Sequence, residues 1–260
     1  MKKKFFKRGI NYIYRYLQIR SRYFYCLKIA LLILLNEIRF IKIKNIILEE
    51  NNYFQKTLEE SNKRKNHYEN SYNFNSMDAF SDNILIWSSF FDDYGLPFKS
   101  GAYLEIGCFE GRSSVFVLEK LKYFNCTFVD PFLEYDELRD SAGITELDEI
   151  YNTFSNNTFN FRDRIQIKKI TSNAFFAVNK DYYDLIYIDG SHYAEDVYLD
   201  CINSFKFLNK GGLIIFDDFL WAHFPNIDEN PITAILDFMY EEKKNIKIKY
   251  ISNQVIVEKL

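Results

Sequence analysis

The chain has 260 residues, of which 48% are hydrophobic and 18% aromatic, a composition that excludes wholesale disorder and supplies a sizeable core. Four cysteines without a C-x-x-C pair indicate reduced thiols in a cytoplasmic protein rather than a disulfide framework. Residues 1–44 hold twelve of the 33 lysines and arginines but one of the 36 acids, which leaves a charge of +11 there and −14 elsewhere. The acidic remainder disfavours a nucleic-acid partner, because phosphate contacts need a basic face.

Residues 1–48 are basic, aromatic and aliphatic, and their densest apolar run is Ile29–Leu35. A helix across a bilayer needs about 20 apolar residues, and charges interrupt this run. We expect a helix that packs on the domain or on a second copy of the chain. An amphipathic helix at the inner membrane surface is the alternative, and a membrane span is the least favoured. The polar residues 49–75 are interpreted as a helix end and linker, so the predicted domains are residues 1–75 and 76–260.

The rest of the chain alternates strand-like and helix-like segments. This predicts a Rossmann-like, doubly wound α/β fold: a seven-stranded, mostly parallel sheet with an antiparallel edge, preceded by an N-terminal helical extension. The expected helices cover residues 76–94, 113–122, 132–158 with a break near Gly143, a short segment from 172, 194–208 and 231–243. The expected strands are residues 102–106, 125–129, 165–170, 184–188 and 213–216, then an antiparallel pair, 246–251 and 254–258.

The stretch Ala102–Ser114, AYLEIGCFEGRSS, is predicted as a buried strand, a turn with Gly107 and Gly111, and the start of a helix. Glycines in such a turn let a ligand approach the backbone. The helix that Ser113 opens offers unpaired N–H groups at its N-terminus. Glu105 places a carboxylate at the strand end, which suits hydroxyls or an amino group better than a phosphate.

This turn does not fit a dinucleotide-binding site. The dinucleotide fingerprint G-x-G-x-x-G lets the backbone approach a pyrophosphate. Counted from Gly107, its second and third glycine positions hold Phe109 and Arg112. The sequence therefore disfavours NAD or FAD as the cofactor.

Acids fall at the predicted carboxyl ends of four strands: Glu105, Asp130, Asp189 and the pair Asp217 and Asp218. These ends share one rim of a parallel sheet, and open α/β sheets bind ligands at that rim. Asp130 lies about twenty residues beyond the glycine turn and is placed to accept hydrogen bonds from both hydroxyls of a ribose. Ser172 and Asn173, after the third strand, are placed to touch an adenine ring. For all three residues, a helix cap is the alternative interpretation.

Asp189, Asp217 and Asp218 form a predicted metal site, because the ends of adjacent parallel strands lie about 4.8 Å apart. Three hard oxygen ligands suit Mg²⁺, Mn²⁺ or Ca²⁺, and a cation relieves their mutual repulsion. Alternatively, Asp217 or Asp218 caps the following turn. His192, on the loop leaving the rim, is predicted to take a proton from a substrate hydroxyl, with a helix cap or a solvated position as alternatives. His223 is placed to line the substrate mouth.

The segments LEIGCFEGRSS, FVDPF and DLIYIDGSHYAEDVYLDCINSFKFLNKGGLIIFDDF resemble the successive motifs of class I S-adenosylmethionine (SAM) methyltransferases, over about residues 76–260. They are similar to those of catechol O-methyltransferase and of the sugar O-methyltransferases of macrolide biosynthesis. Catechol-type enzymes have Asp-Asn after the fifth strand, and the Asp-Asp of this chain points away from catechols. The resemblance implies SAM as cofactor, with roles for Glu105, Gly107 and Gly111 (methionine part), Asp130 (ribose), Asp189, Asp217 and Asp218 (metal) and His192 (base).

The predicted function is SAM-dependent, metal-assisted O-methylation of a hydroxyl on a sugar or another small molecule, with His192 and Asp189 as the catalytic residues and Mg²⁺ as the expected cation. The alternative is a non-catalytic SAM-binding or membrane-associated module that works through the basic arm. Acceptor contacts are expected from residues 76–96, 132–160 and 219–230, whose aromatic side chains suit stacking on a sugar ring or core packing: Tyr135, Tyr151, Trp221 and Phe224.

Overall fold

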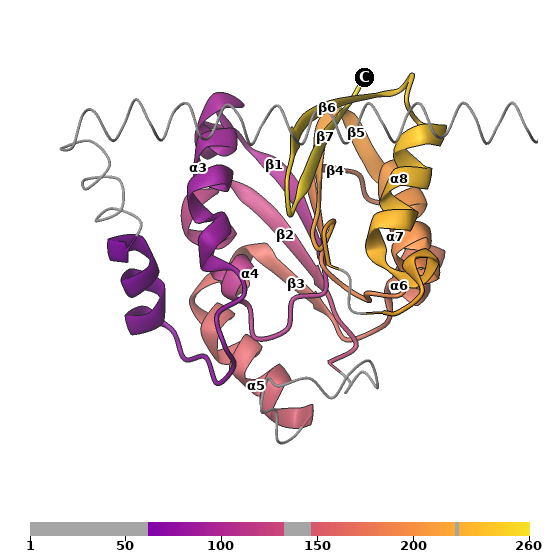
Figure 1. Ribbon diagram of the computed structural model, residues 1–260. Coiled ribbons are helices and arrows are strands. Elements are labelled where there is room, and N and C mark those ends of the chain that lie inside the picture. Colours follow the sequence, from indigo (N-terminus) through magenta and orange to yellow (C-terminus); the bar gives the residue numbers. More distant parts are fainter. Residues whose placement is uncertain (1–61, 133–146, 222–223) are drawn as a thin grey trace, which may run out of the picture.

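The computed structural model describes residues 62–132, 147–221 and 224–260, and it shows a seven-stranded sheet with helices on both faces (Figure 1). The strands are β1 (Gly101–Ile106), β2 (Phe124–Val129), β3 (Ile165–Lys168), β4 (Tyr183–Ile188), β5 (Leu208–Phe216), β6 (Ile246–Ile251) and β7 (Val255–Lys259). They lie in the order β3-β2-β1-β4-β5-β7-β6. The predicted Rossmann-like α/β fold is confirmed.

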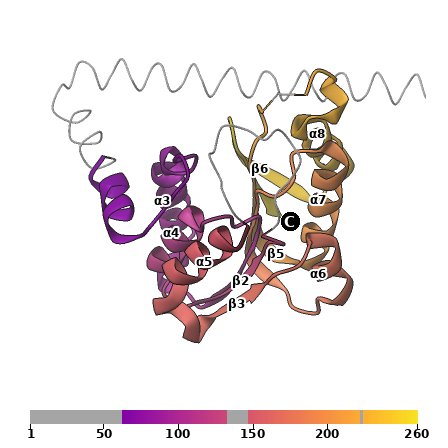
Figure 2. The ribbon, with the colours of Figure 1, turned by 90° about the horizontal axis from the view of Figure 1, so that it is seen from below.

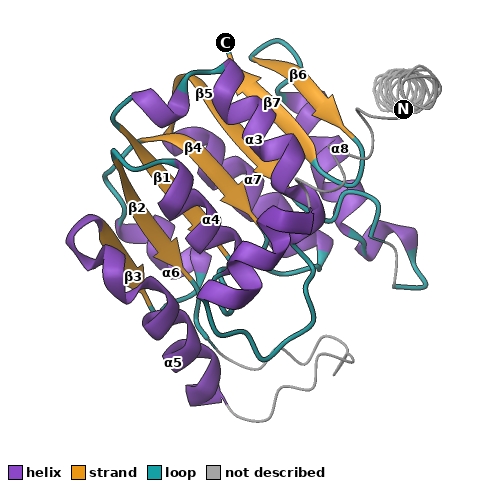
Figure 3. Ribbon diagram, turned by 90° about the vertical axis from the view of Figure 1, so that its left-hand side faces the viewer, coloured by secondary structure: helices purple, strands orange, loops and turns teal. Residues whose placement is uncertain are grey.

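The direction of the strands sets the position of the ligand-binding rim. Strands β1 to β5 are parallel, whereas β7 runs antiparallel to both of its neighbours, β5 and β6. The antiparallel strand is therefore second from the edge rather than at the edge itself. The strand order reverses between β1 and β4, and the carboxyl ends at this switch point form the expected ligand site. Figure 3 shows the sheet with these ends side by side.

Two layers of helices cover the sheet (Figures 1 and 2). One layer contains α3 (Ile84–Asp93), α4 (Arg112–Lys120) and α5 (Leu147–Thr158), and the other contains α6 (Ser172–Val178), α7 (Ala194–Phe207) and α8 (Pro231–Glu241). Short 3₁₀ turns join them: η1 (Ser81–Asn83), η2 (Leu96–Phe98), η3 (Phe159–Arg164) and η4 (Ile227–Glu229). Residues 62–71 form a further helix ahead of α3.

The core consists of two hydrophobic clusters, one on each face of the sheet. Along β4, Leu185 and Tyr187 pack into the cluster under α3, α4 and α5, whereas Ile186 and Ile188 pack into the cluster under α6, α7 and α8. All four side chains are buried, as expected for a central parallel strand covered on both faces. This burial leaves only the strand ends available for chemistry.

Some predicted boundaries differ from the structure. The helix expected from residue 76 begins at Ile84, because the Asp78 side chain accepts hydrogen bonds from the N–H groups of Phe80 and Ser81 and starts η1 instead. Strand β5 begins at Leu208 rather than at residue 213, and its pairing with β4 is interrupted by a bulge. Gly211, with a φ of +77°, lies in this irregular part of the strand where the sequence predicted a turn.

The described residues ahead of the predicted boundary at residue 76 contact the domain. The Tyr72 hydroxyl donates a hydrogen bond of 2.7 Å to Glu119 of α4, and the Tyr68 ring packs edge-on against Phe116. Residues 62–75, expected as a linker, are therefore packed on the domain. The predicted apolar helix around Ile29–Leu35 and the break near Gly143 lie outside the described residues. Within the described ranges, no helix is both long and apolar enough to cross a membrane.

Candidate active site

The turn after β1 is built around two glycines with left-handed backbone. Gly107 has a φ of +82° and Gly111 a φ of +89°. A Cβ atom on Gly107 would lie 1.9 Å from the carbonyl oxygen of Asp189, and one on Gly111 would lie 3.0 Å from the ring of Phe154. Contacts inside the protein thus require both glycines and bring the turns after β1 and β4 together. Their contact with SAM stays a prediction.

Glu105 is fully buried beneath the start of α4. Its carboxylate accepts hydrogen bonds from the hydroxyls of Ser113, Ser114 and Tyr103. Burial raises the pKa of Glu105 to about 7, although these three hydrogen bonds act in the opposite direction. Glu105 thus binds hydroxyls as predicted, but these hydroxyls belong to side chains of the protein. The contact of Glu105 or Ser113 with the methionine part of SAM stays a prediction.

Asp130, at the end of β2, closes the glycine turn from the inside. One carboxylate oxygen accepts hydrogen bonds from the N–H groups of Cys108 (2.8 Å) and Phe109 (2.9 Å), and the other accepts from Phe132 N–H (2.6 Å). Burial raises the pKa of the Asp130 carboxyl, while these backbone N–H groups lower it. A carboxylate has about four lone-pair positions, so Asp130 keeps capacity to accept from a ribose. That contact stays a prediction.

Ser172 and Asn173 open α6, but neither is its cap. The cap is Thr171, whose hydroxyl accepts a hydrogen bond of 3.3 Å from the N–H of Ala174. The Ser172 side chain hydrogen-bonds to Asp200 on α7, and Asn173 is exposed. The helix-cap interpretation of these two residues is therefore wrong by one position. Their contact with adenine stays a prediction, and Ser172 already has a partner within the fold.

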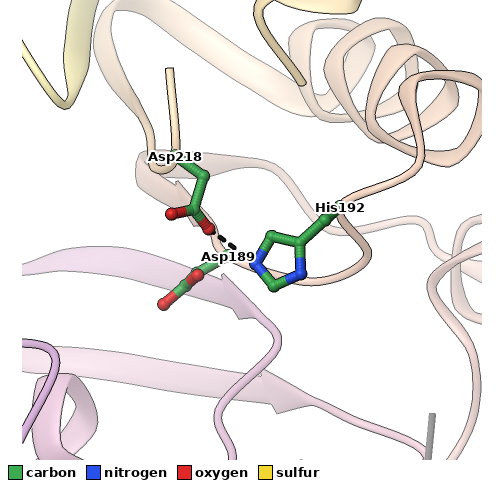
Figure 4. Close-up of side chains that lie close together, drawn as sticks. All are labelled: Asp189, His192 and Asp218. Atoms are coloured by element: carbon green, nitrogen blue, oxygen red, sulfur yellow. Dashed lines mark hydrogen bonds and ion pairs between the residues drawn. The ribbon is translucent and has the colours of Figure 1, made fainter. Parts of the chain in front are cut away.

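Three predicted site residues converge at the ends of β4 and β5. Asp189, His192 and Asp218 offer one ligand atom each, and these atoms lie within 4.8 Å of one another. Figure 4 shows the His192 ring and the Asp218 carboxylate facing each other, with the Asp189 side chain beside them. The imidazole Nε2 of His192 lies 2.8 Å from a carboxylate oxygen of Asp218. The structure thus brings together the predicted base and two of the three predicted metal ligands.

Asp217, the third predicted ligand, is held in a different network. Its carboxylate accepts hydrogen bonds from the hydroxyl of Tyr187, from the side-chain amide of Gln254 (2.9 Å) and from the N–H of Asp218 (2.8 Å). Both residues follow the last residue of β5, and the left-handed backbone of Asp218 (φ +56°) departs from the strand geometry. His192 takes the place that the sequence assigned to Asp217 in the group of candidate ligands.

The Tyr187 hydroxyl lies between two carboxylates, because it contacts Asp217 and also bonds to Asp189 at 2.8 Å. Burial raises the pKa of Asp189 well above its ordinary value, and the charges of Asp217 and Asp218 add to this effect. Burial and Asp218 likewise raise the pKa of Asp217. A divalent cation between Asp189 and Asp218 would relieve this repulsion. The donor set of two carboxylates and an imidazole therefore fits a divalent cation.

A buried hydrogen-bond chain supports the rim from behind. The indole N–H of Trp87, on α3, donates to the side-chain oxygen of Gln254 at 2.8 Å, and Gln254 donates in turn to Asp217. The Trp87 ring also packs edge-on against Tyr187, with centroids 4.6 Å apart. Sequence reasoning missed these three supporting residues, since a buried aromatic residue or a lone glutamine before a strand carries no motif.

Several residues at the rim of the sheet have positive φ angles although they are not glycines. In the described part of the chain, the non-glycine residues with positive φ are Phe109 (+48°), Phe132 (+49°) and Asp218 (+56°). They follow β1, β2 and β5 respectively. Such conformations cost roughly 1–3 kcal/mol each and persist where the surrounding structure holds them. The strain in the backbone is therefore concentrated where the predicted ligands would bind.

Aromatic side chains join the loops after β4 and β5 beside His192. The imidazole of His192 stacks on Trp221 with centroids 4.5 Å apart and an interplanar angle of 11°. Tyr193 stacks on Phe224 at 4.6 Å, and Trp221 meets Phe224 edge-on at 5.0 Å. Two of the predicted acceptor-binding aromatics thus lie next to the candidate base. Tyr135 and His223 lie outside the described residues, and Tyr151 packs against Phe132.

Residues 104–219 match a protein family described as a methyltransferase domain, and they run from β1 to the turn after β5. This region is a class I SAM-dependent methyltransferase domain. The methyltransferase domain contains all the residues predicted for catalysis, cofactor binding and metal binding. An uncharacterised protein of Acanthamoeba polyphaga mimivirus is 31% identical over 125 residues, which cover 45% of this chain. The chain spans about half the length of this curated relative, with 51% of it covered.

Solved structures share the fold of the domain. A crystal structure from Klebsiella pneumoniae, described as an O-methyltransferase, is 11% identical with a TM-score of 0.52 and covers 76% of this chain and 89% of that chain. A cofactor-bound protein from MTB is 12% identical with a TM-score of 0.50, covering 77% and 88%. At these identities the likeness supports the fold and its strand order alone.

Proposed function

We propose that the chain is a SAM-dependent O-methyltransferase that methylates a hydroxyl of a small molecule, with a sugar as the first candidate, assisted by Mg²⁺. The observation that carries the proposal is the convergence of Asp189, His192 and Asp218 on the rim of a methyltransferase domain. The stacked aromatic side chains beside His192 favour an acceptor with a ring, since such side chains stack on sugar rings and on aromatic rings alike.

Asp189 and Asp218 would hold the cation, because Mg²⁺ prefers carboxylate oxygens and keeps water in its other positions. When bound, the cation lowers the pKa of the acceptor hydroxyl and orients it. Asp218 also accepts the hydrogen bond from Nε2 of His192, which leaves the lone pair of the imidazole on Nδ1. In this arrangement His192 is the base, and Asp218 and the stacked Trp221 hold its ring in place.

The reaction is an in-line displacement. The acceptor oxygen forms a bond to the methyl carbon of SAM while the bond between that carbon and the sulfonium sulfur breaks. The hydroxyl proton passes to His192, and the products are a methyl ether and S-adenosylhomocysteine. The rim contributes mainly by alignment of donor and acceptor, which replaces an encounter in solution by a positioned pair.

A second role for His192 is that of third metal ligand, because its nitrogen lies within the group of candidate ligands. The choice of cation separates the two roles. Mg²⁺ prefers oxygen ligands only and would leave the imidazole of His192 to act as base. Mn²⁺ and Zn²⁺ are less selective for oxygen and would accept the imidazole as a ligand. The proposal is therefore specific to Mg²⁺ with His192 as base.

The test is calorimetric titration of the full chain with SAM, with and without Mg²⁺. We expect SAM binding in the wild type and a separate Mg²⁺ heat that disappears in Asp189→Asn. The matched control is Asp181→Asn, at an exposed position just ahead of the first residue of β4 and thus far from the rim, which should bind both ligands as the wild type does. His192→Ala should keep both binding heats and lose turnover about 100-fold or more in an acceptor screen that starts with sugars.

Each outcome bears on a different part of the proposal. Absence of SAM binding in the wild type contradicts the function itself. SAM binding without a Mg²⁺ heat reduces the cluster of acids to a structural role. Loss of the Mg²⁺ heat in His192→Ala assigns His192 as a ligand, and full turnover in that variant removes the base. SAM binding without turnover on any acceptor favours the non-catalytic SAM-binding alternative.

A further inference from the structure

The glycine turn of the methyltransferase domain is covered by residues 72–76, here named the strap. The strap follows the helix of residues 62–71, ends before η1 and lies ahead of the matched region 104–219. Its contact with the turn is made through Glu110, the residue before Gly111. The Glu110 side chain is 2% exposed, although Glu110 belongs to a surface turn.

The strap supplies the hydrogen bonds that a buried carboxylate needs. Glu110 accepts from the N–H of Asn75 (3.1 Å), from the N–H of Ser76 (3.0 Å) and from the hydroxyl of Ser76 (2.6 Å). Burial of a carboxylate without such partners is costly. In the absence of the strap, Glu110 would therefore turn to solvent and draw the glycine turn with it.

Further contacts fix the strap on both sides of Glu110. Asn157 of α5 exchanges two hydrogen bonds with the backbone of Asn73 and donates a third, of 3.0 Å, to the carbonyl oxygen of Glu110. Arg112, the first residue of α4, donates to the carbonyl oxygen of Ser76 at 2.6 Å and lies 4.1 Å above the ring of Phe74. The strap, the turn and two helices thus form one connected unit.

The turn needs this support because its backbone is strained. Phe109 has a φ of +48°, and its N–H is held by Asp130 from the inside of the turn. Glu110, the next residue, is held by the strap from the outside. A strained conformation persists only where its surroundings specify it, and here two carboxylates on opposite sides do so.

We infer that Glu110 is a positioning residue for SAM: the strap holds the glycine turn in its ligand-binding conformation through the carboxylate of Glu110. The cofactor site is therefore completed by residues ahead of the methyltransferase region. The affinity for SAM falls in proportion to the fraction of molecules whose turn is correctly formed. This inference rests on the proposed function only in taking SAM as the ligand of the turn.

Glu119 provides a matched control. It lies on α4 and accepts hydrogen bonds from Tyr72 (2.7 Å) and His67 (2.9 Å), so it holds the same N-terminal segment on the domain. Within the described ranges, these hydrogen bonds of Glu119 go to the N-terminal segment and not to the glycine turn. Glu110→Ala and Glu119→Ala therefore remove the same side chain from two attachment points of the same segment.

The experiment measures SAM affinity by calorimetry and the thermal midpoint of the full chain for both variants. We expect Glu110→Ala to bind SAM about tenfold more weakly or worse, and Glu119→Ala to lose thermal stability but keep its SAM affinity. Glu110→Gln, which keeps one acceptor oxygen, should fall between Glu110→Ala and the wild type, and it supplies the measurement if Glu110→Ala does not fold.

Wild-type affinity in Glu110→Ala, or in Glu110→Gln where only that variant folds, overturns the inference. Equal weakening of SAM binding in Glu119→Ala also overturns it, because the effect would then follow from a loosened segment. A wild-type chain that does not bind SAM contradicts the proposed function instead, which separates that failure from a failure of the inference.

Discussion

Asp200, on α7, is a buried acid with few partners. The side chain is 3% exposed and hydrogen-bonds to Ser172, while its other oxygen and the hydroxyl of Ser204, one turn further along, have no hydrogen-bond partner in the described structure. Burial raises the pKa of Asp200 to about 7 from an ordinary value of 3.8, and the Ser172 hydrogen bond lowers it by less. The charged form of Asp200 therefore opposes folding.

Asp200→Asn should change how stability depends on pH. A carboxyl whose pKa is higher in the folded than in the unfolded state does not destabilise the fold at a pH below its unfolded-state pKa. It destabilises the fold fully at a pH above its folded-state pKa. The shift in the pKa from 3.8 to about 7 corresponds to a loss of up to roughly 4 kcal/mol in the free energy of unfolding, at about 1.4 kcal/mol per pH unit. We expect the variant to match the wild type near pH 4 and to exceed its free energy of unfolding above pH 7.

Urea unfolding from pH 4 to pH 8 measures this difference. Glu195→Gln, at an exposed position in the first turn of α7, is the control and should give a difference that is flat across the range. An Asp200→Asn variant that is destabilised by the same amount at every pH would contradict the assignment of the penalty to the ionised carboxylate.

At the scale of residues, the sequence predicted which acids lie on the rim but not how each side chain is used. Asp189 and Asp218 converge with His192 as expected, because strand ends are visible in the sequence pattern. Asp217 differs since the φ of +56° at Asp218 and the two donors Tyr187 and Gln254 decide its direction. Those contacts cross from β4 and from the turn before β7, which no local pattern reports.

At the scale of elements, α3 and the turn before β7 support the rim of β4 and β5. The link is the chain from Trp87 through Gln254 to Asp217, which reaches Asp189 through the shared hydroxyl of Tyr187. Residues that orient metal ligands in this indirect way commonly change metal affinity by 10–100-fold when mutated. The last hairpin of the sheet therefore contributes to a site that lies outside it.

Gln254→Leu should weaken Mg²⁺ binding about tenfold, because Asp217 loses a donor and draws Tyr187 away from Asp189. The buried indole N–H of Trp87 loses its acceptor, which should cost about 1–3 kcal/mol of stability. Mg²⁺ calorimetry and urea unfolding measure the two effects. Gln166→Leu, exposed on β3, is the control. If Gln254→Leu loses stability as expected but keeps its Mg²⁺ affinity, the hydrogen-bond chain does not support the metal site.

The sequence predicted which helices and strands are present better than it predicted where they begin. The parallel strands and the closing antiparallel pair follow from apolar runs bounded by turn residues, and the structure has all of them. The start of α3 was missed because hydrogen bonds to Glu110 and Asp78 hold residues 75–81 out of a helix. The early start of β5 was missed because its bulge includes a glycine that also signals a turn.

At the scale of the whole molecule, the charge of the chain is divided between a basic N-terminal arm and an acidic remainder. Residues 1–44 carry +11 and the rest −14, although these first residues lie outside the described structure. Basic residues at an anionic lipid surface contribute about 1 kcal/mol each. If the arm forms the alternative amphipathic helix at a membrane surface, the full chain should sediment with vesicles that contain phosphatidylserine and be released by salt, which screens the attraction.

Vesicles of phosphatidylcholine alone are the control and should not retain the chain. Equal binding to both kinds of vesicle would indicate insertion of the apolar run Ile29–Leu35 rather than charge. Absence of binding to either would favour a helix that packs on the domain or on a second copy of the chain.

The packing of residues 62–75 on the domain was the feature least predictable from the sequence. The composition of residues 49–75 is polar, and polarity is the ordinary mark of a linker. In the structure, residues 72–76 instead satisfy Glu110 and Asn157 with their own backbone groups. Backbone hydrogen bonds leave no trace in composition, so this packing could not be read from the residue types.

The two tryptophans of the chain lie on either side of the candidate site, and their fluorescence is a natural probe of it. The chain has two tryptophans. Trp87 is buried and hydrogen-bonded to Gln254 behind Asp217, whereas Trp221 lies face to face with His192 on the partly exposed side. Intrinsic fluorescence therefore reports on the site from both sides without any label. Single Trp→Phe variants would assign a spectral change to the buried side or to the partly exposed side of the site.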